Sequence, residues 1–419
     1  MISQLSTRMR ERLAGFLGNV CEGLCKRASV FTGEMVYGIL ASGSVVLTQI
    51  GRQLGEGISL KQTEKRLSRN LARPELERIL ARGVLEDAAS RIGQDTLLIL
   101  DPTDISKRHA RKMEHLATIR DGSEKQLGKG YWMVSVVAAE TCGRKMIPLW
   151  SQVFSQESPD FISENAEIIR AIREISGVTG GRGVWVVDRG GDRGRLFEEL
   201  LGGDGRYRFI VRLRGDRHLL PARGGAMPAR ELAARVSLGH TQRIVRERGN
   251  TSRVSTIRFG ARKVRLPAAP ETDLWLVVAR GLGSEPLMLL TNCRISRSVR
   301  SVWWVVESYL TRWSIEEAIR WIKQAYDLEN LRVLTFQRIR NLVWLVTLAA
   351  YFLAVLVSGR NRLRLAVLRL LDVGKPLFGI PEMPLYALSR GIAVAFSRHP
   401  RAPRPHRPPP SLQLPLFET

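Results

Sequence analysis

Short apolar runs separated by turn residues dominate the middle of the chain. TLLIL, YWMVSVVAAE, KMIPLWSQVF, GVWVV and RYRFIVRL have the length and composition of strands and begin at residues 96, 131, 145, 183 and 206. Helical spacing is expected near 163–175 and 193–201. This order predicts an α/β fold with a mixed sheet flanked by helices, in which ligands bind at the carboxyl ends of strands. We assign residues 90–213 to the first part of this core.

Residues 1–75 are predicted to form an all-helical, basic region that breaks at Pro74. Within it, the apolar run VVLTQIGRQL, the turn GEGIS and the run LKQTEKRLSRNL suggest helix, turn, helix. Ser59 and Gln62 form a capping-box pattern, so the second helix is expected to begin at the next residue after Ser59. That helix carries Lys61, Lys65 and Arg66. The pattern is typical both of a small DNA-binding unit and of the solvated face of a helical bundle.

A β-rich insertion is expected at 214–299. The segments QRIVRE, SRVSTIRFGARKVRL and DLWLVVAR alternate like strands and are separated by Gly, Asn and Pro. Residues 206–265 contain 16 Arg or Lys and 3 Asp or Glu, a net charge of +13. Arg212 and Arg214, at the start of this basic segment, are therefore candidates for DNA contacts.

Helical spacing returns at 300–395, which we assign to the second part of the core, and 398–419 is a Pro/Arg-rich tail expected to be disordered. The run from Leu342 to Val357 is apolar apart from Thr347. Its 16 residues fall short of the roughly 20 needed to cross a bilayer, so a buried core helix is favoured over a membrane span.

The charge of the whole chain narrows the class of partner. Lys and Arg number 65 against 40 Asp and Glu, which gives a net charge of +25 over 419 residues. An excess this large favours a polyanion, because each neutralised phosphate releases a condensed counterion. The N-terminus lacks the unbroken apolar stretch of a signal peptide, and the four cysteines are scattered, so the cytoplasm is the expected compartment.

Two carboxylates follow apolar strands directly. Asp101 comes after TLLIL and Asp188 after GVWVV, so both are expected at the carboxyl edge of the sheet. The ordinary role of such an Asp is a turn former or helix N-cap. We assign that role to Asp192, where the next helix begins, and it is also plausible for Asp104, whereas Asp101 and Asp188 do not precede a helix in the same way.

A third acidic candidate lies in YLTRWSIEEAIRWIKQ. On a continuous helix Tyr309, Arg312, Glu316, Arg320 and Lys323 share a stripe about 80° wide and about 21 Å long, enough to follow several phosphates. Glu317 lies about 100° away from Glu316. The simpler interpretation is a surface with i,i+4 salt bridges from Arg312 to Glu316 to Arg320. The neighbouring Trp313 is expected in the core.

Tyr309, Arg312, Glu316 and Lys323 fit the pattern Y-x2-R-x3-E-x6-K, and the chain thereby resembles the insertion-sequence-4 family of bacterial DDE transposases. Asp101 within LILDPTDISK and Asp188 within WVVDRGGDRG look like the first and second acidic motifs of that family. The resemblance extends over nearly the whole chain. It implies an RNase H-like catalytic core interrupted by the β-rich insertion.

The resemblance also implies a mechanism. Asp101, Asp188 and Glu316 would hold two divalent cations, Mg²⁺ or Mn²⁺, while Tyr309, Arg312 and Lys323 would bind phosphates near the cut. The reaction would be a nick that frees a 3′-OH, followed by strand transfer, in cut-and-paste transposition. The partners would be double-stranded DNA, both as transposon ends and as target, and a second copy of the chain in a synaptic dimer. No membrane would be involved. The protein would act in the bacterial cytoplasm, in association with the nucleoid.

Two other functions fit the same residues. One is a transposase-derived DNA-binding protein that no longer catalyses, and the other is a sequence-independent nuclease on the same core. The resemblance also makes Trp275, in the insertion, a candidate for stacking on a flipped base.

Overall fold

The computed structural model describes residues 2–120, 126–141, 145–202, 207–248, 251–296, 298–358, 384–397 and 402–406. The chain begins with helices, as predicted, and the helical region continues past Pro74 to Ala89. The capping box of Ser59 and Gln62 is present and starts the fourth helix. These helices are α1 (Ile2–Val20), α2 (Lys26–Ser42), α3 (Leu47–Leu54), α4 (Leu60–Leu71) and α5 (Leu76–Ala89).

The predicted mixed sheet is confirmed. Strand β1 pairs with β3 in the antiparallel direction and with β5 in the parallel direction, and β5 is parallel to β6. Strands β2 and β4 lie beside β3. The strands are β1 (Leu97–Ser106), β2 (Ala117–Arg120), β3 (Leu127–Ala139), β4 (Met146–Phe154), β5 (Val184–Val187) and β6 (Arg208–Arg212), with helices α6 (Glu164–Thr179) and α7 (Gly194–Leu201) and the 3₁₀ turn η1 (Arg189–Gly191).

The first strand is longer than its apolar run. It continues through Asp101 to Ser106 and stays paired with β3 throughout, so the expectation that Asp101 ends a strand is wrong. On its other side, however, β5 ends at Val187, which is paired with Leu100. Asp101 therefore lies where β1 loses its parallel neighbour, directly beside Asp188.

The basic segment after β6 forms further strands of the same sheet. Strand β12 pairs with β6, so hydrogen bonding continues from the core into this segment in the order β2-β3-β1-β5-β6-β12-β11-β10-β7-β8. No pattern along the chain indicated this continuity. The elements are β7 (His218–Pro221), β8 (Met227–Pro228), α8 (Ala229–Ala234), β9 (His240–Arg248), β10 (Thr251–Leu266), β11 (Ala269–Arg280) and β12 (Leu287–Thr291).

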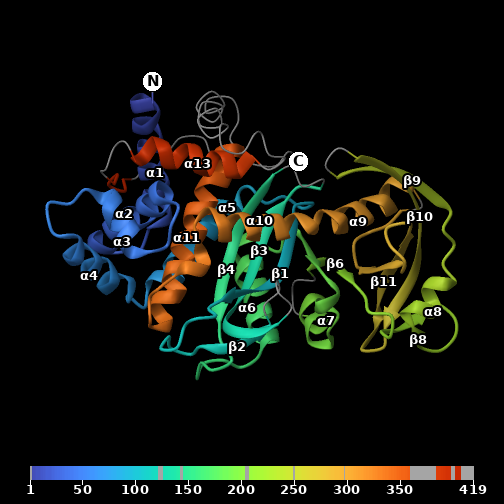
Figure 1. Cartoon of the computed structure of the whole chain (residues 1–419). Coiled ribbons are helices and arrows are strands. Elements are labelled where there is room, and N and C mark those ends of the chain that lie inside the picture. The colour runs from blue at the N-terminus through green and yellow to red at the C-terminus, as the bar shows by residue number, and fades with distance from the viewer. Residues whose placement is uncertain are drawn as a thin grey trace.

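The chain then returns to the core as helices. Helices α9 and α10 lie end to end across the sheet, and α11 stands between the sheet and the N-terminal helices (Figure 1). Asn341 of α11 donates to the carbonyl oxygens of Leu71 and Arg73 and accepts from the amide of Glu77, which ties the α4–α5 connection to α11. The elements are α9 (Val299–Thr311), α10 (Trp313–Ala325), the 3₁₀ turn η2 (Leu328–Asn330), α11 (Phe336–Ser358) and α13 (Pro384–Ser397).

Helix α11 confirms the predicted core helix, but for a different reason. Its apolar stretch covers the 21 residues Phe336–Leu356, which is long enough to cross a bilayer, so the argument from length was wrong. Burial decides the matter, because 89% of the most apolar window lies inside the protein.

Part of the tail predicted to be disordered is placed. Residues 402–406 lie against the first two helices, where the amide of His406 donates to the carbonyl oxygen of Ala14 at 3.2 Å and Pro403 and Pro405 approach Gly33. The rest of the segment 398–419 lies outside the described residues.

Candidate active site

Strand alternation places the first two carboxylates on one face of the sheet. Leu97 and Ile99 pack in the same apolar cluster as Val184 and Val186, whereas the residues between them pack in the cluster on the opposite face. Because side chains alternate along a strand, Asp101 continues the first set, and Asp188, next after β5, does the same. The cluster on this face includes residues of α9 and α10.

The third carboxylate reaches this face from the first turn of α10. Arg312, at the break between α9 and α10, donates from Nη2 to Glu316 Oε1 at 2.9 Å, and its Nη1 lies 3.9 Å from Asp101 Oδ2. The Arg312 side chain is 9% exposed, and that of Glu316 is 51% exposed. One buried guanidinium thus links Glu316 to Asp101.

The carboxylates influence each other electrostatically. Burial raises the pKa of Asp101 from 3.8 to about 7; the Arg312 charge opposes the shift, and the negative charges of Asp188 and Glu316 add to it. Asp101 is therefore difficult to ionise unless a cation compensates it.

Contrary to expectation, Asp188 also acts as a turn former. Its Oδ1 accepts the amide of Gly190 at 2.7 Å and caps the 3₁₀ turn η1. One carboxylate oxygen is therefore held by the backbone, which fixes the direction of the side chain.

The three carboxylates have the oxygen donors that divalent cations prefer, but they are not spaced as the ligands of a metal site in this structure. Within the described ranges, no group of three or more His, Cys, Asp or Glu is arranged so as to hold a metal ion. An all-carboxylate donor set on one face suits Mg²⁺ or Mn²⁺. The positive charge now beside Asp101 and Glu316 is that of Arg312, which bonds one carboxylate oxygen of Glu316, Oε1.

The predicted exposed stripe is only partly correct. Tyr309 and Arg312 are buried, and the helix is interrupted at Arg312. Arg320 pairs with Glu317 rather than with Glu316, whereas the expected Arg312–Glu316 pair is confirmed. The stripe therefore does not present a continuous row of cations.

Three further side chains near this helix have positions that the sequence did not indicate. Lys323 Nζ lies 2.9 Å from Glu329 and 3.9 Å from Asp104, which is buried in β1 and caps no helix. Trp313 is 46% exposed, so its predicted place in the core is wrong. It lies on the exposed face of α10 with Glu316, Glu317 and Arg320, at helical spacing.

The predicted cap role of Asp192 is also wrong. Arg193 occupies the N-cap position of α7, and its side chain makes no capping hydrogen bond. Asp192 is buried and accepts hydrogen bonds from the amide of Arg214 at 2.7 Å and from Arg217 Nε at 2.6 Å. No local pattern could have shown these partners, which lie in the next stretch of sheet.

The candidate DNA contacts outside α10 differ in their availability. Lys61 and Lys65 are exposed on α4, but Arg66 pairs with Glu34 and Glu56, each at 2.6 Å, so its charge is neutralised within the fold. Arg212 is half-buried in β6, and Arg214 is exposed with its guanidinium 3.4 Å from Asp216.

Trp275, the candidate for base stacking, is half-buried on β11. Lys263 lies across the strand pair from it, with the ammonium 5.7 Å from the centre of the Trp275 ring. The ring thus already has a cation as its neighbour.

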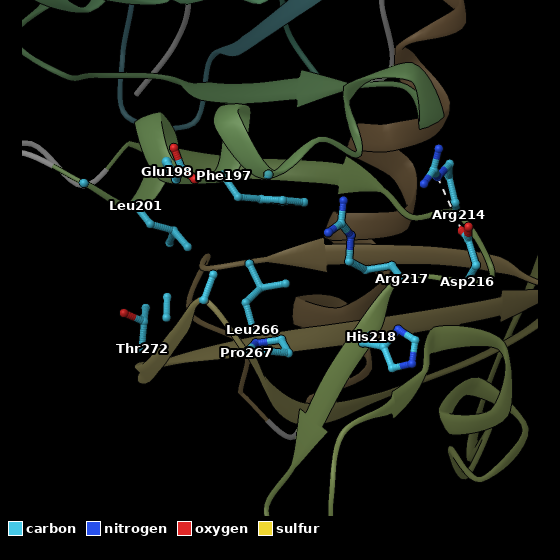
Figure 2. A pocket seen from close by; sticks show the side chains of 14 residues that line it. Phe197, Glu198, Leu201, Arg214, Asp216, Arg217, His218, Leu266, Pro267 and Thr272 are labelled. Atoms are coloured by element: carbon cyan, nitrogen blue, oxygen red, sulfur yellow. Dashed lines mark ion pairs between the residues drawn. The ribbon is translucent and has the colours of Figure 1, made fainter.

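A cavity of about 450 Å³ lies between α7 and the strands that follow β6. Phe197 and Leu201 line it from α7, and Leu266 and Pro267 line it from the β10–β11 turn; Arg217 points into the space between them (Figure 2). No sequence signal indicated this cavity, because its walls come from segments far apart in the chain.

Residues 92–353, more than half of the chain, match the family model described as the transposase DDE domain. A solved structure, the piggyBac transposase synaptic complex with hairpin DNA, aligns with a TM-score of 0.43 and 11% identity, covering 93% of this chain and 78% of that chain. No curated protein sequence matches the chain.

Proposed function

The chain belongs to the DDE transposase family and is a DNA transposase; from that premise we propose that it cuts and joins the terminal inverted repeats of an insertion sequence of the insertion-sequence-4 group. The observation that carries the proposal is the placement of Asp101, Asp188 and Glu316 on one face of the sheet, inside the matched domain.

Two features support the assignment to this group and to an RNase H-like core. Tyr309, Arg312, Glu316 and Lys323 keep the spacing of the Y-R-E-K signature, although α9 and α10 are separated at Arg312. The strand order β4-β3-β1-β5-β6 combines an antiparallel meander with two parallel strands. The segment from β7 to β12 would then be the β-rich insertion, joined to the core through β6.

In this proposal Asp101, Asp188 and Glu316 hold two divalent cations, Mg²⁺ or Mn²⁺. When bound, the metals supply an activated water and charge stabilisation for the attacking and leaving oxygens of the phosphodiester. The protein fixes the directions of the carboxylates: β1 holds Asp101, and the amide of Gly190 holds Asp188. Release of Glu316 would leave Arg312 free to bind a phosphate, and Lys323 would bind another.

The reaction follows from these roles. Hydrolysis joins the water oxygen to phosphorus and releases the 3′ oxygen of the adjoining nucleotide, which takes up a proton. The freed 3′-OH then attacks a second phosphodiester and displaces its 3′ oxygen, so strand transfer needs no covalent protein intermediate. We further propose that two copies act together in a synaptic dimer, one at each transposon end, in the bacterial cytoplasm.

The test is Mg²⁺-dependent cleavage of duplex DNA that carries the inverted repeats flanking the gene. Asp188→Asn and Glu316→Gln are expected to abolish cleavage while DNA binding persists, because each removes one negative ligand. Glu317→Gln is the matched control, since it changes the adjacent carboxylate of the same helix turn. An Asp188→Asn protein that still cleaved would remove Asp188 from the site.

The same assay separates the alternatives. Equal cleavage of transposon ends and random duplex would favour the sequence-independent nuclease. A wild-type protein that binds the ends and cleaves nothing in Mg²⁺ or Mn²⁺ would favour the DNA-binding protein without catalysis.

A further inference from the structure

Asp192 connects the turn after β5 with the first residues beyond β6. Its side chain has no exposed surface, and Arg217, with which it pairs at 2.6 Å, is 24% exposed. Arg217 Nη2 donates in addition to the main-chain oxygen of Asp192 at 3.0 Å, and the amide of Arg214 donates to Oδ2. Both carboxylate oxygens and the carbonyl of Asp192 are thus bonded to residues of the next segment.

Asp192 itself belongs to the turn that begins at Asp188. The amide of Gly191 donates to the carbonyl oxygen of Asp188 at 3.0 Å, and the amide of Asp192 donates to that of Arg189 at 3.3 Å. Gly191 packs so closely on Val187 that a β-carbon at this position would overlap the valine side chain. The turn has little freedom of its own, so a displacement of Asp192 would be passed to Asp188.

Arg217 belongs to the basic segment beyond β6. Its carbonyl oxygen accepts the amide of Ala229 at the start of α8 at 2.7 Å, and its guanidinium lies 5.6 Å from the ring centre of Phe197 on α7. The cavity of about 450 Å³ opens beside this point (Figure 2). Beside this cavity, the ion pair joins the turn before α7 to the segment between β6 and β7.

Asp192 is buried more deeply than a residue that only caps a helix needs to be. An N-cap carboxylate functions while largely exposed, and the N-cap side chain of α7 makes no capping hydrogen bond. A fully buried carboxylate is costly unless it is paired and hydrogen-bonded, and removing one partner leaves an uncompensated charge. The fold therefore commits Arg217 to this one carboxylate, at the junction between the catalytic turn and the basic strands.

We propose that the Asp192–Arg217 pair is a positioning contact that couples DNA held by the basic strands to the orientation of Asp188. The inference rests on the proposed function, in which Asp188 takes part in cleavage. Asp192 and Arg217 are positioning residues, since they act on the reaction through the turn and not on the scissile phosphate.

The experiment compares full-length wild type with Asp192→Asn, Arg217→Gln, the double variant and Arg217→Lys. The control is Arg173→Gln/Glu199→Gln, which removes a bidentate pair between α6 and α7, at 2.9 and 2.6 Å, whose arginine is exposed. Affinity for inverted-repeat DNA is measured in Ca²⁺. The cleavage rate is measured at saturating DNA over a range of Mg²⁺ concentrations, with the folded fraction determined by circular dichroism.

We expect each single variant to bind DNA within about twofold of wild type, to cleave about 10- to 100-fold more slowly at saturating DNA, and to need more Mg²⁺ for its half-maximal rate. The double variant should be no worse than either single one, because both remove the same contact. Arg217→Lys should recover part of the rate, since it keeps the charge but loses the forked geometry. The control should match wild type.

The results distinguish failure of the proposed function from failure of the positioning role. If wild type does not cleave, the proposed function fails. If wild type cleaves and the folded variants keep its rate and Mg²⁺ midpoint, or lose rate only in proportion to their folded fraction, the positioning role is refuted and the function stands. Should Asp192→Asn or Arg217→Gln not fold, Arg217→Lys decides by the same two readouts.

Discussion

At the scale of single residues, arginine side chains that the sequence suggests are free to bind DNA form ion pairs with carboxylates within the fold. Arg66 joins Glu34 and Glu56, and Arg312 contacts Glu316 and lies near Asp101. A guanidinium that is partly buried needs a compensating charge, and the fold supplies one. Arg312 is therefore already engaged by carboxylates, whereas Lys61 and Lys65 are exposed on α4.

The raised pKa of Asp101 predicts that the stability of the metal-free protein depends on pH. This pKa is about 7 in the fold against 3.8 ordinarily, so folding favours the protonated form. This stabilisation is complete below about pH 4 and is lost as the pH rises through about 7. In EDTA, the thermal unfolding midpoint of wild type should fall between about pH 5 and about pH 8 more than that of Asp101→Asn.

Glu317→Gln serves as the control for this comparison, because Glu317 lies on α10 and pairs with Arg320. It should retain the wild-type slope. An Asp101→Asn protein whose midpoint falls as steeply as that of wild type would assign the pH dependence to other groups.

At the scale of elements, close backbone contacts fix how the N-terminal helices cross. Gly83 of α5 lies against the carbonyl group of Val20 at the end of α1, and a β-carbon there would overlap it. Gly177 of α6 has open space around the same position. The close approach of α1 therefore requires a glycine at position 83, whereas no such contact requires one at position 177.

Alanine substitution tests this difference. Gly83→Ala should lower the free energy of unfolding by about 1–3 kcal/mol, because α1 and α5 must separate. Gly177→Ala should raise it by up to about 1 kcal/mol through helix propensity. Urea unfolding monitored by circular dichroism measures both, and a Gly83→Ala protein as stable as Gly177→Ala would contradict the close crossing.

At the scale of the whole molecule, one sheet runs from β2 in the core to β8 in the basic segment (Figure 1). The positive charge is therefore carried by strands of the same sheet as those bearing the catalytic candidates, connected to them through β11, β12 and β6. Arg243 on β9 and Arg258 on β10 are exposed there, whereas Arg265 on β10 pairs with Asp273 at 3.0 Å.

Salt dependence of DNA binding measures the contribution of this surface. Arg243→Ala and Arg258→Ala should each weaken binding and reduce the slope of log K against log salt by about one unit per lost phosphate contact. Arg265→Ala is the matched control and should change the slope less, because its charge is already compensated. Slopes unchanged by both exposed-site variants would mean that this charge does not serve DNA binding.

The sequence by itself determined those features that depend on near neighbours in the chain. Alternating apolar runs predicted the core strands, and the Ser59–Gln62 pattern predicted where α4 begins. The acidic positions after two apolar runs, together with the signature around Glu316, indicated a DDE transposase, which the domain match shows, whereas the insertion-sequence-4 group stays a prediction.

Only the tertiary structure decided which partners these residues have. It brought Arg312 between Asp101 and Glu316, paired Asp192 with Arg217, continued the sheet from β6 into β12, and buried a helix long enough to cross a membrane. The physical reason is that periodicity and capping are set within one or two turns of chain, whereas burial and ion pairing depend on which distant segments the packed sheet brings together.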